Sequence, residues 1–446
     1  MSIIAMLMSA AGSGAVSFLA KMAHQGNQYQ TSPVCLASAV LGYYHADFGV
    51  IAGELFKAVV TKFTPDGSVL WQTKLGFSVA SYPRAMVEAL DGSKLYVLIE
   101  ASDAPSGNVG YFIACLNAAD GTLLAKSPWL YSESNTAPYS LYIDIDGNIR
   151  PCGSIIGYRP FFPKLSGATL AIINLDSYNV TSGYGYGIGT ETGGNTVVSS
   201  MTIWESGGAP GGQKGNLLRL SGTTSSVLTN HVFVSDGGDY YPYSSAIDGA
   251  NNIFWGGRCN IGTGAYAPIL MKIDPEQNVV FSKYVTGGSS GCSVEVDGAG
   301  NIFVFAEKWM GDVSSCALLK FDGNFNFIGG YKLALTGASA MVVNQFGGAL
   351  SIRGSNLCAC WTFVNSVSET AYPIMLVCAT EGSFLKPGTY AVGGISILIS
   401  AISSVPMTAL AMTRYAATSG LTTSGSSAVA TPVIAIAVAA PNLKIM

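Results

Sequence analysis

Two stretches of the chain repeat one pattern of apolar and polar positions. "AIDGANNIFWGG" occupies residues 246–257, and "EVDGAGNIFVFAE" occupies residues 295–307, 49 residues further on. In each, a short strand leads into an Asp-Gly turn, and a run rich in Ile and Phe follows. Asp and Gly tolerate the positive φ angles that tight hairpin turns require. Each stretch therefore predicts a β-hairpin, which we call the inner hairpin.

Weaker copies of the inner hairpin are spread along the chain. Their turns are expected near residues 47, 91, 146, 206, 248, 297 and 346. A second, outer hairpin alternates with the first and is clearest in "KIDPEQNVVFSKYV" (272–285) and "KFDGNFNFIGGYKL" (320–333). Its turns are expected near residues 66, 120, 176, 222, 274, 322 and 381. Two hairpins per unit give four strands, and the unit occurs seven times.

Four-stranded units of this length, arranged radially, are the blades of a β-propeller. The sequence predicts an all-β fold with a seven-bladed propeller over residues 33–390. A low-charge N-terminal segment (1–32) and a β-rich, low-charge C-terminal extension (391–446) lie outside the repeat. The first and fourth units match the pattern poorly, so six or eight blades stay open. A β-sandwich would not show two-hairpin units of constant length, and a β-helix repeat would be far shorter.

The outer pattern K-F-D-x-x-G-x-V-x-W-x-x-x-L followed by V-D-x-x-G-N-I-F-V-x-G resembles the repeats of quinoprotein-like and related bacterial β-propellers, across residues 33–390. The resemblance implies a blade and says little about chemistry. For a quinoprotein dehydrogenase it would also imply a quinone and a calcium ion in the central channel. Few Asp or Glu lie outside the turns, and "CAC" (358–360) is not an adjacent cysteine pair. We therefore expect no cofactor.

Composition narrows the function classes. Charged residues make up 11% of the chain, against roughly 25% in a typical soluble domain. A net charge of −4 without a basic run argues against nucleic-acid binding. The nine cysteines lie mostly in apolar runs and predict reduced core thiols. With three histidines and no zinc-like spacing, we expect no metal site.

Both ends of the chain lack charge. Residues 3–20 are uncharged and just long enough to span a membrane, but no Lys or Arg precedes them, so we expect no cleaved signal peptide. From residue 391 onward the only charges are Arg414 and Lys444. Apolar strands in water expose unpaired edges. We expect both ends to be buried, either against the propeller or against other subunits. A membrane-embedded segment 3–20 is the third, less favoured alternative.

No catalytic constellation stands out in the sequence. "GYGYGIGTETGG" (183–194) lacks the Lys-Ser/Thr of a phosphate loop and predicts a loop between the third and fourth blades. "YIDIDGNIRP" (142–151) lacks the closing Glu of a calcium loop and predicts a hairpin turn. Exposed aromatic side chains can stack on sugars or anchor a protein partner. The surface-binding candidates are Tyr184, Tyr186, Tyr240, Tyr241 and Tyr243, with packing over blade edges as the alternative.

These features predict a non-enzymatic structural or interaction protein. Low charge, many Gly and Ala, and ends that need burial are typical of a bacteriophage virion component, such as a tail, fibre or capsid-decorating protein made in the host cytoplasm. Its expected partners are other virion subunits and, for the tyrosines, a host-surface glycan. Two alternatives stay open: a carbohydrate-binding propeller, and a propeller lyase or hydrolase with its site in the central channel.

Overall fold

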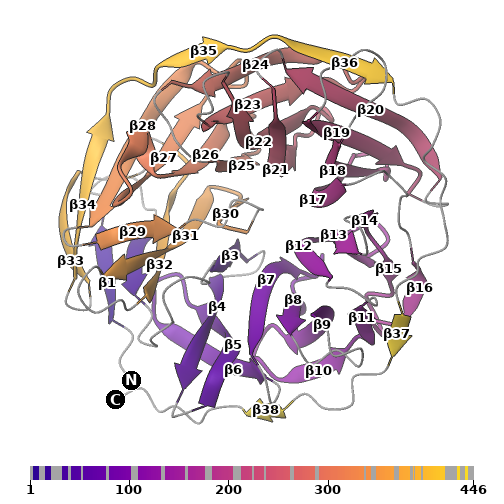
Figure 1. The fold of residues 1–446 in the computed structure, drawn as a ribbon. Coiled ribbons are helices and arrows are strands. Elements are labelled where there is room, and N and C mark those ends of the chain that lie inside the picture. The colour runs from indigo at the N-terminus through magenta and orange to yellow at the C-terminus, as the bar shows by residue number, and fades with distance from the viewer. Residues whose placement is uncertain are drawn as a thin grey trace.

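The structure is a computed structural model of the chain. It describes residues 4–9, 16–21, 33–38, 42–51, 54–76, 80–101, 109–131, 136–155, 159–175, 183–203, 212–222, 226–235, 238–261, 266–286, 291–335, 338–342, 348–365, 371–381, 385, 387–392, 395–416, 429–431 and 437–439. Seven antiparallel sheets stand around a central axis as the blades of a propeller, which confirms the predicted fold class and blade count (Figure 1).

Each blade runs outward from its innermost strand. Blades 1 to 3 contain β3 (Val34–Ala37), β4 (Tyr43–Ile51), β5 (Glu54–Phe63) and β6 (Val69–Gly76); β7 (Ser81–Glu88), β8 (Lys94–Ala101), β9 (Gly110–Asn117), β10 (Leu123–Lys126) and β11 (Trp129–Tyr131); and β12 (Ala137–Ile143), β13 (Ile149–Ile155), β14 (Arg159–Phe161), β15 (Lys164–Leu165) and β16 (Ile172–Asn174).

Blades 4 to 6 follow the same order. They contain β17 (Gly183–Thr190), β18 (Thr196–Ile203), β19 (Gln213–Leu220) and β20 (Val227–Ser235); β21 (Tyr240–Ile247), β22 (Ile253–Asn260), β23 (Tyr266–Ile273) and β24 (Val279–Val285); and β25 (Cys292–Val296), β26 (Ile302–Glu307), β27 (Ser315–Phe321) and β28 (Phe327–Leu335). A single 3₁₀ turn, η1 (Trp309–Gly311), joins β26 to β27.

Blade 7 combines two strands from the N-terminal end of the chain with strands from residues 338–379. Its innermost strand is interrupted into β29 (Ala338–Val342) and β30 (Leu350–Arg353), followed by β31 (Asn356–Asn365) and β32 (Ala371–Ala379). Its outer strands are β2 (Val16–Lys21) and β1 (Ile4–Ser9), and β2 pairs with β32 from Phe18 opposite Val377 to Lys21 opposite Ile374. The N-terminal strand thereby closes the ring. Contacts of residues 1–32 with other subunits stay a prediction.

The C-terminal chain runs back around the outside of the ring, visible as the yellow strands at the periphery of Figure 1. We call these strands the outer belt: β33 (Gly388–Val392) and β34 (Ile395–Ile402) on blade 6, β35 (Met407–Ala409) on blade 5, β36 (Met412–Ala416) on blade 4, β37 (Val429–Thr431) on blade 2 and β38 (Ala437–Ala439) on blade 1. Ile397 and Ile399 are buried by this packing. The extension is therefore β-rich, as expected.

Most of the predicted turns lie where the repeat places them. The inner turns near 91, 146, 248 and 297 and the outer turns near 66, 120, 222, 274 and 322 join consecutive strands. The inner turn expected near 47 is wrong, because residues 45–51 continue strand β4. The outer turn expected near 381 does not return into blade 7, because β2 takes the place of the fourth strand.

Three further turn positions, near 176, 206 and 346, fall outside the described residues. The turns that join the strands of these blades lie elsewhere: Ser166 and Ala171 close the outer hairpin of blade 3, and Glu191 and Asn195 close the inner hairpin of blade 4. The inner hairpin of blade 7 turns at Gly354. At these three turns no Asp-Gly pair occurs, so the turn positions predicted from the repeat were displaced along the chain.

The stretch 183–194 is also not a loop. It forms β17, the innermost strand of blade 4, and the tight turn that follows it. Its glycines fit because the strand approaches its neighbours closely: a Cβ at Gly187 would lie 2.4 Å from Ser245 Oγ, and one at Gly185 would lie 2.7 Å from Cys152 Sγ. The alternation of Gly and Tyr thus reflects strand periodicity rather than loop composition.

Ring closure predicts a large effect at Phe18. This fully buried side chain packs against Tyr43 and Phe63, with ring centroids 5.5 and 5.9 Å away. Phe18→Ala is expected to lower the free energy of unfolding by about 3–5 kcal/mol, because it leaves a cavity between β2 of blade 7 and strands β4 and β5 of blade 1. Urea unfolding followed by tryptophan fluorescence measures it.

The matched control is Leu124→Ala, which removes an apolar side chain that is 51% exposed. We expect a change within about 0.5 kcal/mol. Equal losses for the two variants would contradict closure of the ring by β2.

Candidate functional site

The seven innermost strands enclose a cavity of about 130 Å³ on the propeller axis. Every blade contributes to its wall, and the lining residues are Cys35, Leu36, Ala85, Met86, Ser140, Leu141, Gly187, Ile188, Ser244, Ser245, Glu295, Gly348, Leu350 and Ser351. Seven of these side chains are aliphatic or sulfur-containing, four are serines, two residues are glycines and one is a glutamate. The long central channel of this fold is a usual place for ligands.

Four of the innermost strands contain a β-bulge shortly before the cavity. The extra residue is Arg84 in β7, Tyr139 in β12, Tyr186 in β17, and the pair Pro242 and Tyr243 in β21. A bulge re-aims the side chain of the extra residue and is one of the few strand positions that accept proline. Prolines 83, 138 and 242 accordingly lie at three of these bulges. The bulges direct aromatic side chains of neighbouring blades toward one another.

The result is an aromatic cluster across blades 3 to 5, which we call the tyrosine cluster. The ring centroid of Tyr186 lies 5.1 Å from that of Tyr139, 5.3 Å from that of Tyr243 and 5.8 Å from that of Tyr184. Tyr186 and Tyr243 are almost fully buried, while Tyr139 and Tyr184 are half-buried. Burial raises the pKa of the Tyr243 phenol to about 12, so the cluster stays uncharged at neutral pH.

Arg258 brings a positive charge to the tyrosine cluster. Its guanidinium carbon lies 4.5 Å from the ring centres of both Tyr241 and Tyr266, and 5.4 Å from that of Tyr243. Stacking of this kind stabilises a cation by about 0.5–2 kcal/mol per contact, depending on its solvation. The arrangement holds the guanidinium in a fixed orientation with one side half-exposed. A planar cation between aromatic rings is suited to bind sugar hydroxyls or a carboxylate.

The structure brings four of the five predicted tyrosines together and separates the fifth. Tyr184, Tyr186, Tyr241 and Tyr243 belong to the tyrosine cluster, whereas Tyr240 is fully buried against Trp255 between blades 4 and 5. Of the four, only Tyr184 is more than one-tenth exposed, so packing accounts for most of them. Surface binding by these residues stays a prediction.

Sequence reasoning missed Tyr139, Tyr266, Arg84 and Arg258. A signal for Tyr139 was present: Tyr139, Tyr186 and Tyr243 each stand five residues before the acid that opens the inner turn of their blade. That common offset marks one structural position in three successive blades. Arg258 carried no comparable signal, because its role depends on contacts across β21, β22 and β23.

Glu295 projects from β25 into the cavity wall and is the one carboxyl among the lining residues. Burial raises its pKa from 4.5 to about 8, partly offset by the backbone N–H of Val296. The cavity contains no Lys, Arg or His among its lining residues to stabilise the ionised form. The carboxyl group is therefore protonated at neutral pH when the cavity holds only water.

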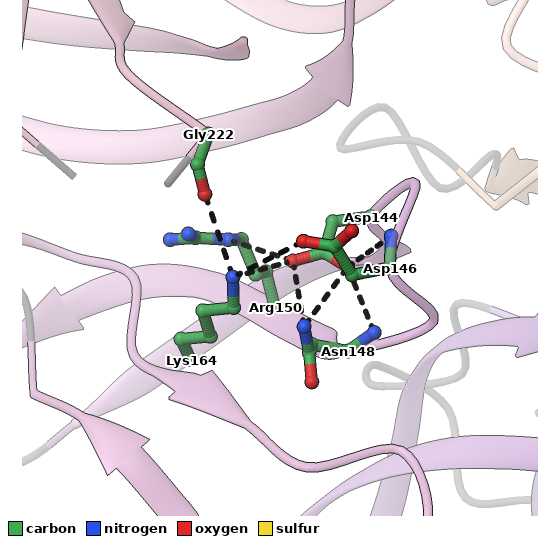
Figure 2. Close-up of polar contacts among 6 residues, drawn as sticks. All are labelled: Asp144, Asp146, Asn148, Arg150, Lys164 and Gly222. Atoms are coloured by element: carbon green, nitrogen blue, oxygen red, sulfur yellow. Dashed lines mark hydrogen bonds and ion pairs between the residues drawn. The ribbon is translucent and has the colours of Figure 1, made fainter. Parts of the chain in front are cut away.

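The densest cluster of buried charge lies elsewhere, between blades 3 and 4 (Figure 2). Lys164 Nζ lies 3.1 Å from Asp144 Oδ2 and donates to the Gly222 carbonyl oxygen of the next blade at 3.4 Å. The fully buried Arg150 places Nε 3.7 Å from the same carboxylate. Asp144 also accepts hydrogen bonds from the backbone N–H groups of Asp146 and Asn148, as the predicted hairpin turn requires.

This cluster is one example of a repeated contact between blades. The Lys that opens the outer motif donates to a carbonyl oxygen of the following blade in three other places: Lys62 to Ala118 at 2.7 Å, Lys272 to Gly323 at 3.1 Å and Lys320 to Thr380 at 2.6 Å. The motif lysine thus joins successive blades. We therefore assign the cluster in Figure 2 to blade packing rather than to catalysis.

Three further findings concern the described residues as a group. No set of three or more His, Cys, Asp or Glu side chains is placed to hold a metal ion in the part of the chain that the structure describes. All nine cysteines are buried and free, which confirms the predicted core thiols. Within the same residues, no helix has the length and apolar character needed to cross a membrane.

No protein-family model and no curated protein matches the sequence. Among solved structures, the polysaccharide lyase Uly1 is similar at 9% identity and a TM-score of 0.47, over 76% of this chain and 88% of that one. The β-propeller domain of the Trilobed protease from Pyrococcus furiosus is similar at 9% identity and a TM-score of 0.45, over 80% and 97%. A protein of unknown function from Dyadobacter fermentans is similar at 8% identity and a TM-score of 0.43, over 84% and 98%.

Asp144 neutralises two buried cations, so its removal is expected to be costly. Asp144→Asn should lower the free energy of unfolding by about 3–5 kcal/mol, because it removes the buried carboxylate that lies 3.7 Å from Arg150 Nε and 3.1 Å from Lys164 Nζ. Chemical unfolding of the full chain measures this loss. Asp146→Asn is the control, since that side chain is 63% exposed and lies 4.0 Å from Lys164, and about 0–1 kcal/mol is expected. An unchanged free energy of unfolding for Asp144→Asn would refute the assignment of this cluster to blade packing.

Glu295 predicts a loss of stability as the pH rises from about 4.5 to about 8. Its pKa is higher in the folded state (about 8) than the ordinary value of 4.5, so the folded state holds the proton more tightly. The stabilisation is complete below about pH 4.5 and is lost as pH rises toward 8, by up to about 1.4 kcal/mol per pH unit. Glu295→Gln should flatten this dependence in unfolding curves measured from pH 5 to 9. Parallel curves for the two proteins would contradict a buried, protonated Glu295.

Proposed function

We propose that the protein is a non-enzymatic structural protein that joins neighbouring subunits through the outer belt. The observation that carries the proposal is the edge that the belt leaves open. In the described residues, β35 and β36 end the sheets of blades 5 and 4, with no strand beyond them. Their backbone groups on that side are available to pair with a strand of another chain.

The side chains of this edge support pairing. Between residues 395 and 416 the one charged residue is Arg414, and its guanidinium donates to the Glu276 carbonyl oxygen at 2.9 Å. Most exposed positions are small or hydroxylic, among them Ser403, Ser404, Thr408, Ala409, Ala411 and Thr413. Leu398, Pro406 and Arg414 are exposed as well. Soluble proteins usually protect such edges with charges, prolines or short bulges. An edge with one charged residue over this length is suited to be covered in an assembly.

Virion proteins form assemblies in which every copy is surrounded by neighbours. We therefore infer a bacteriophage virion component, such as a tail, fibre or capsid-decorating protein that is made in the host cytoplasm. The low overall charge, the many glycines and the low-charge belt support this inference. The partners are then other virion subunits, and neither nucleic acid nor membrane is part of the proposal.

The tyrosine cluster favours a second candidate function, carbohydrate binding. Half-buried Tyr139 and Tyr184 offer ring faces, and Arg258 offers donors in a fixed plane. In a virion this surface would contact a host glycan. A lyase or hydrolase is less well supported, because glycoside hydrolysis in most families uses two carboxyl groups and Glu295 is one.

The belt proposal predicts that the full chain forms defined oligomers. Ala409→Lys combined with Thr413→Lys places two charges on the open edge and should shift the solution mass toward the monomer, because paired strands would bury those charges. Light scattering after size exclusion measures the mass. The control is Thr169→Lys with Ser68→Lys, exposed turn residues of other blades. A full chain that stays monomeric at high concentration would contradict the proposal.

Carbohydrate binding predicts a signal on a glycan array that depends on the tyrosine cluster. Tyr184→Ala should reduce the signal about fivefold or more, because stacking on a sugar contributes about 1 kcal/mol or more. Ile173→Ala, an exposed apolar residue on the outer edge of blade 3, is the control. An array without any Tyr184-dependent signal would contradict carbohydrate binding by the tyrosine cluster and leave the outer belt as the one proposed binding surface.

A further inference from the structure

We propose that the cavity on the propeller axis is a binding site for a small, singly charged cation, held by the carboxylate of Glu295 and by serine hydroxyls of neighbouring blades. The candidates share one chemistry: an alkali ion such as K⁺, or an ammonium group. The proposal is independent of the outer belt and of the tyrosine cluster, and it concerns the cavity wall alone.

Charge determines the sign of the ligand. Glu295 is the one group on the wall that carries a charge when it ionises near neutral pH, and none of the lining residues is Lys, Arg or His. The other titratable group on the wall is the thiol of Cys35, whose pKa is raised well above its ordinary value by burial. An anion would meet no cationic side chain in the cavity wall, whereas a cation would supply the counter-charge for the Glu295 carboxylate.

The remaining donors are oxygen atoms suited to a hard cation. Ser140, Ser244, Ser245 and Ser351 line the same cavity. Ser244 Oγ accepts a hydrogen bond from the Val294 N–H at 3.2 Å, and Ser351 Oγ accepts one from the Ala37 N–H at 3.1 Å. These bonds fix the hydroxyl oxygens and leave lone pairs for a ligand. Carboxylate and hydroxyl oxygens are typical ligands of alkali and alkaline-earth ions.

One glycine shapes the wall beside Ser245. A Cβ at position 187 would lie 2.4 Å from Ser245 Oγ, so any other residue there would displace the hydroxyl group. Gly187 and Ser245 come from the innermost strands of adjacent blades, and both line the cavity. The absence of a side chain at 187 therefore keeps the Ser245 hydroxyl at the wall. That position makes Gly187 a useful site for a test.

Size and charge count restrict the ligand further. A cavity of about 130 Å³ has room for roughly four water molecules, or for one ion with part of its hydration shell. A tetraethylammonium ion is too large to enter. Tight calcium sites use several carboxylates, and the described residues contain no cluster of three acidic, cysteine or histidine ligands. One carboxylate matches one positive charge.

Cation binding must be coupled to proton release. Glu295 has a pKa of about 8, so at pH 7 the cation replaces the proton of a neutral carboxyl group. The apparent Kd should then fall about tenfold per pH unit as pH rises toward 8, and should level off above it. A hydroxyl-only site would show no such dependence.

The test measures thermal unfolding of the full chain at pH 8 in chloride salts of K⁺, Na⁺, NH₄⁺ and tetraethylammonium at equal ionic strength. A small cation should raise the Tm of the natural protein progressively with concentration, as binding to the folded state requires. Tetraethylammonium should not. Glu295→Gln should abolish the increase, and Asp146→Asn, on an exposed turn, should retain it. A response to K⁺ and Na⁺ alone, or to NH₄⁺ alone, distinguishes the two sources.

Two results would overturn the proposal. One is an equal response of the natural protein and Glu295→Gln, and the other is an equal response to small cations and tetraethylammonium. Should Glu295→Gln fail to fold, Gly187→Ala provides a second variant, expected to weaken the cation response at least tenfold by displacing Ser245. Isothermal titration of the natural protein in two buffers of different ionisation enthalpy completes the test: about one proton released per cation at pH 7 supports the site, and none contradicts it.

Discussion

The pairing of β2 with β32 is the constraint on which the rest of the structure depends. A propeller is a ring of blades that each need both neighbours, and a ring built from one chain must be closed where its ends meet. Here Phe18, Leu19 and Ala20 are fully buried in the last blade, so the N-terminal strand is part of the core. Closure brings the seven innermost strands around one axis and thereby creates the cavity that contains Glu295.

Because the N-terminal strand fills the fourth position of blade 7, the C-terminal chain is left outside the ring. It cannot return to the blade that precedes it and instead adds strands to blades 6, 5, 4, 2 and 1 in turn (Figure 1). Each addition moves the open edge outward without closing it. The N-terminal strand closes the ring, and the C-terminal strands form the exposed edge of low charge.

The repeat made the propeller predictable from sequence, because Asp-Gly turns and period-two strands are local properties of the chain. The lysine of the outer motif was visible too, although its bond to the next blade could be seen only in three dimensions. Blades 1, 3, 4 and 7 were misplaced in part, since their turns use other residues and one strand of blade 7 comes from the other end of the chain. Four tyrosines of the tyrosine cluster were predicted from sequence, and Tyr139 and Tyr266 were missed. Tyr139 is the extra residue of a β-bulge, which re-aims a side chain that period-two reasoning directs elsewhere.

Hydrogen exchange of the full chain, compared between dilute and concentrated solution, tests this account most directly. The account predicts slow exchange in β2 (Val16–Lys21) at both concentrations, because that strand closes the ring. It predicts that exchange in β35 and β36 (residues 407–416) is faster in dilute solution and slows on association. Fast exchange in β2, or protection on association that spares residues 407–416, would contradict it.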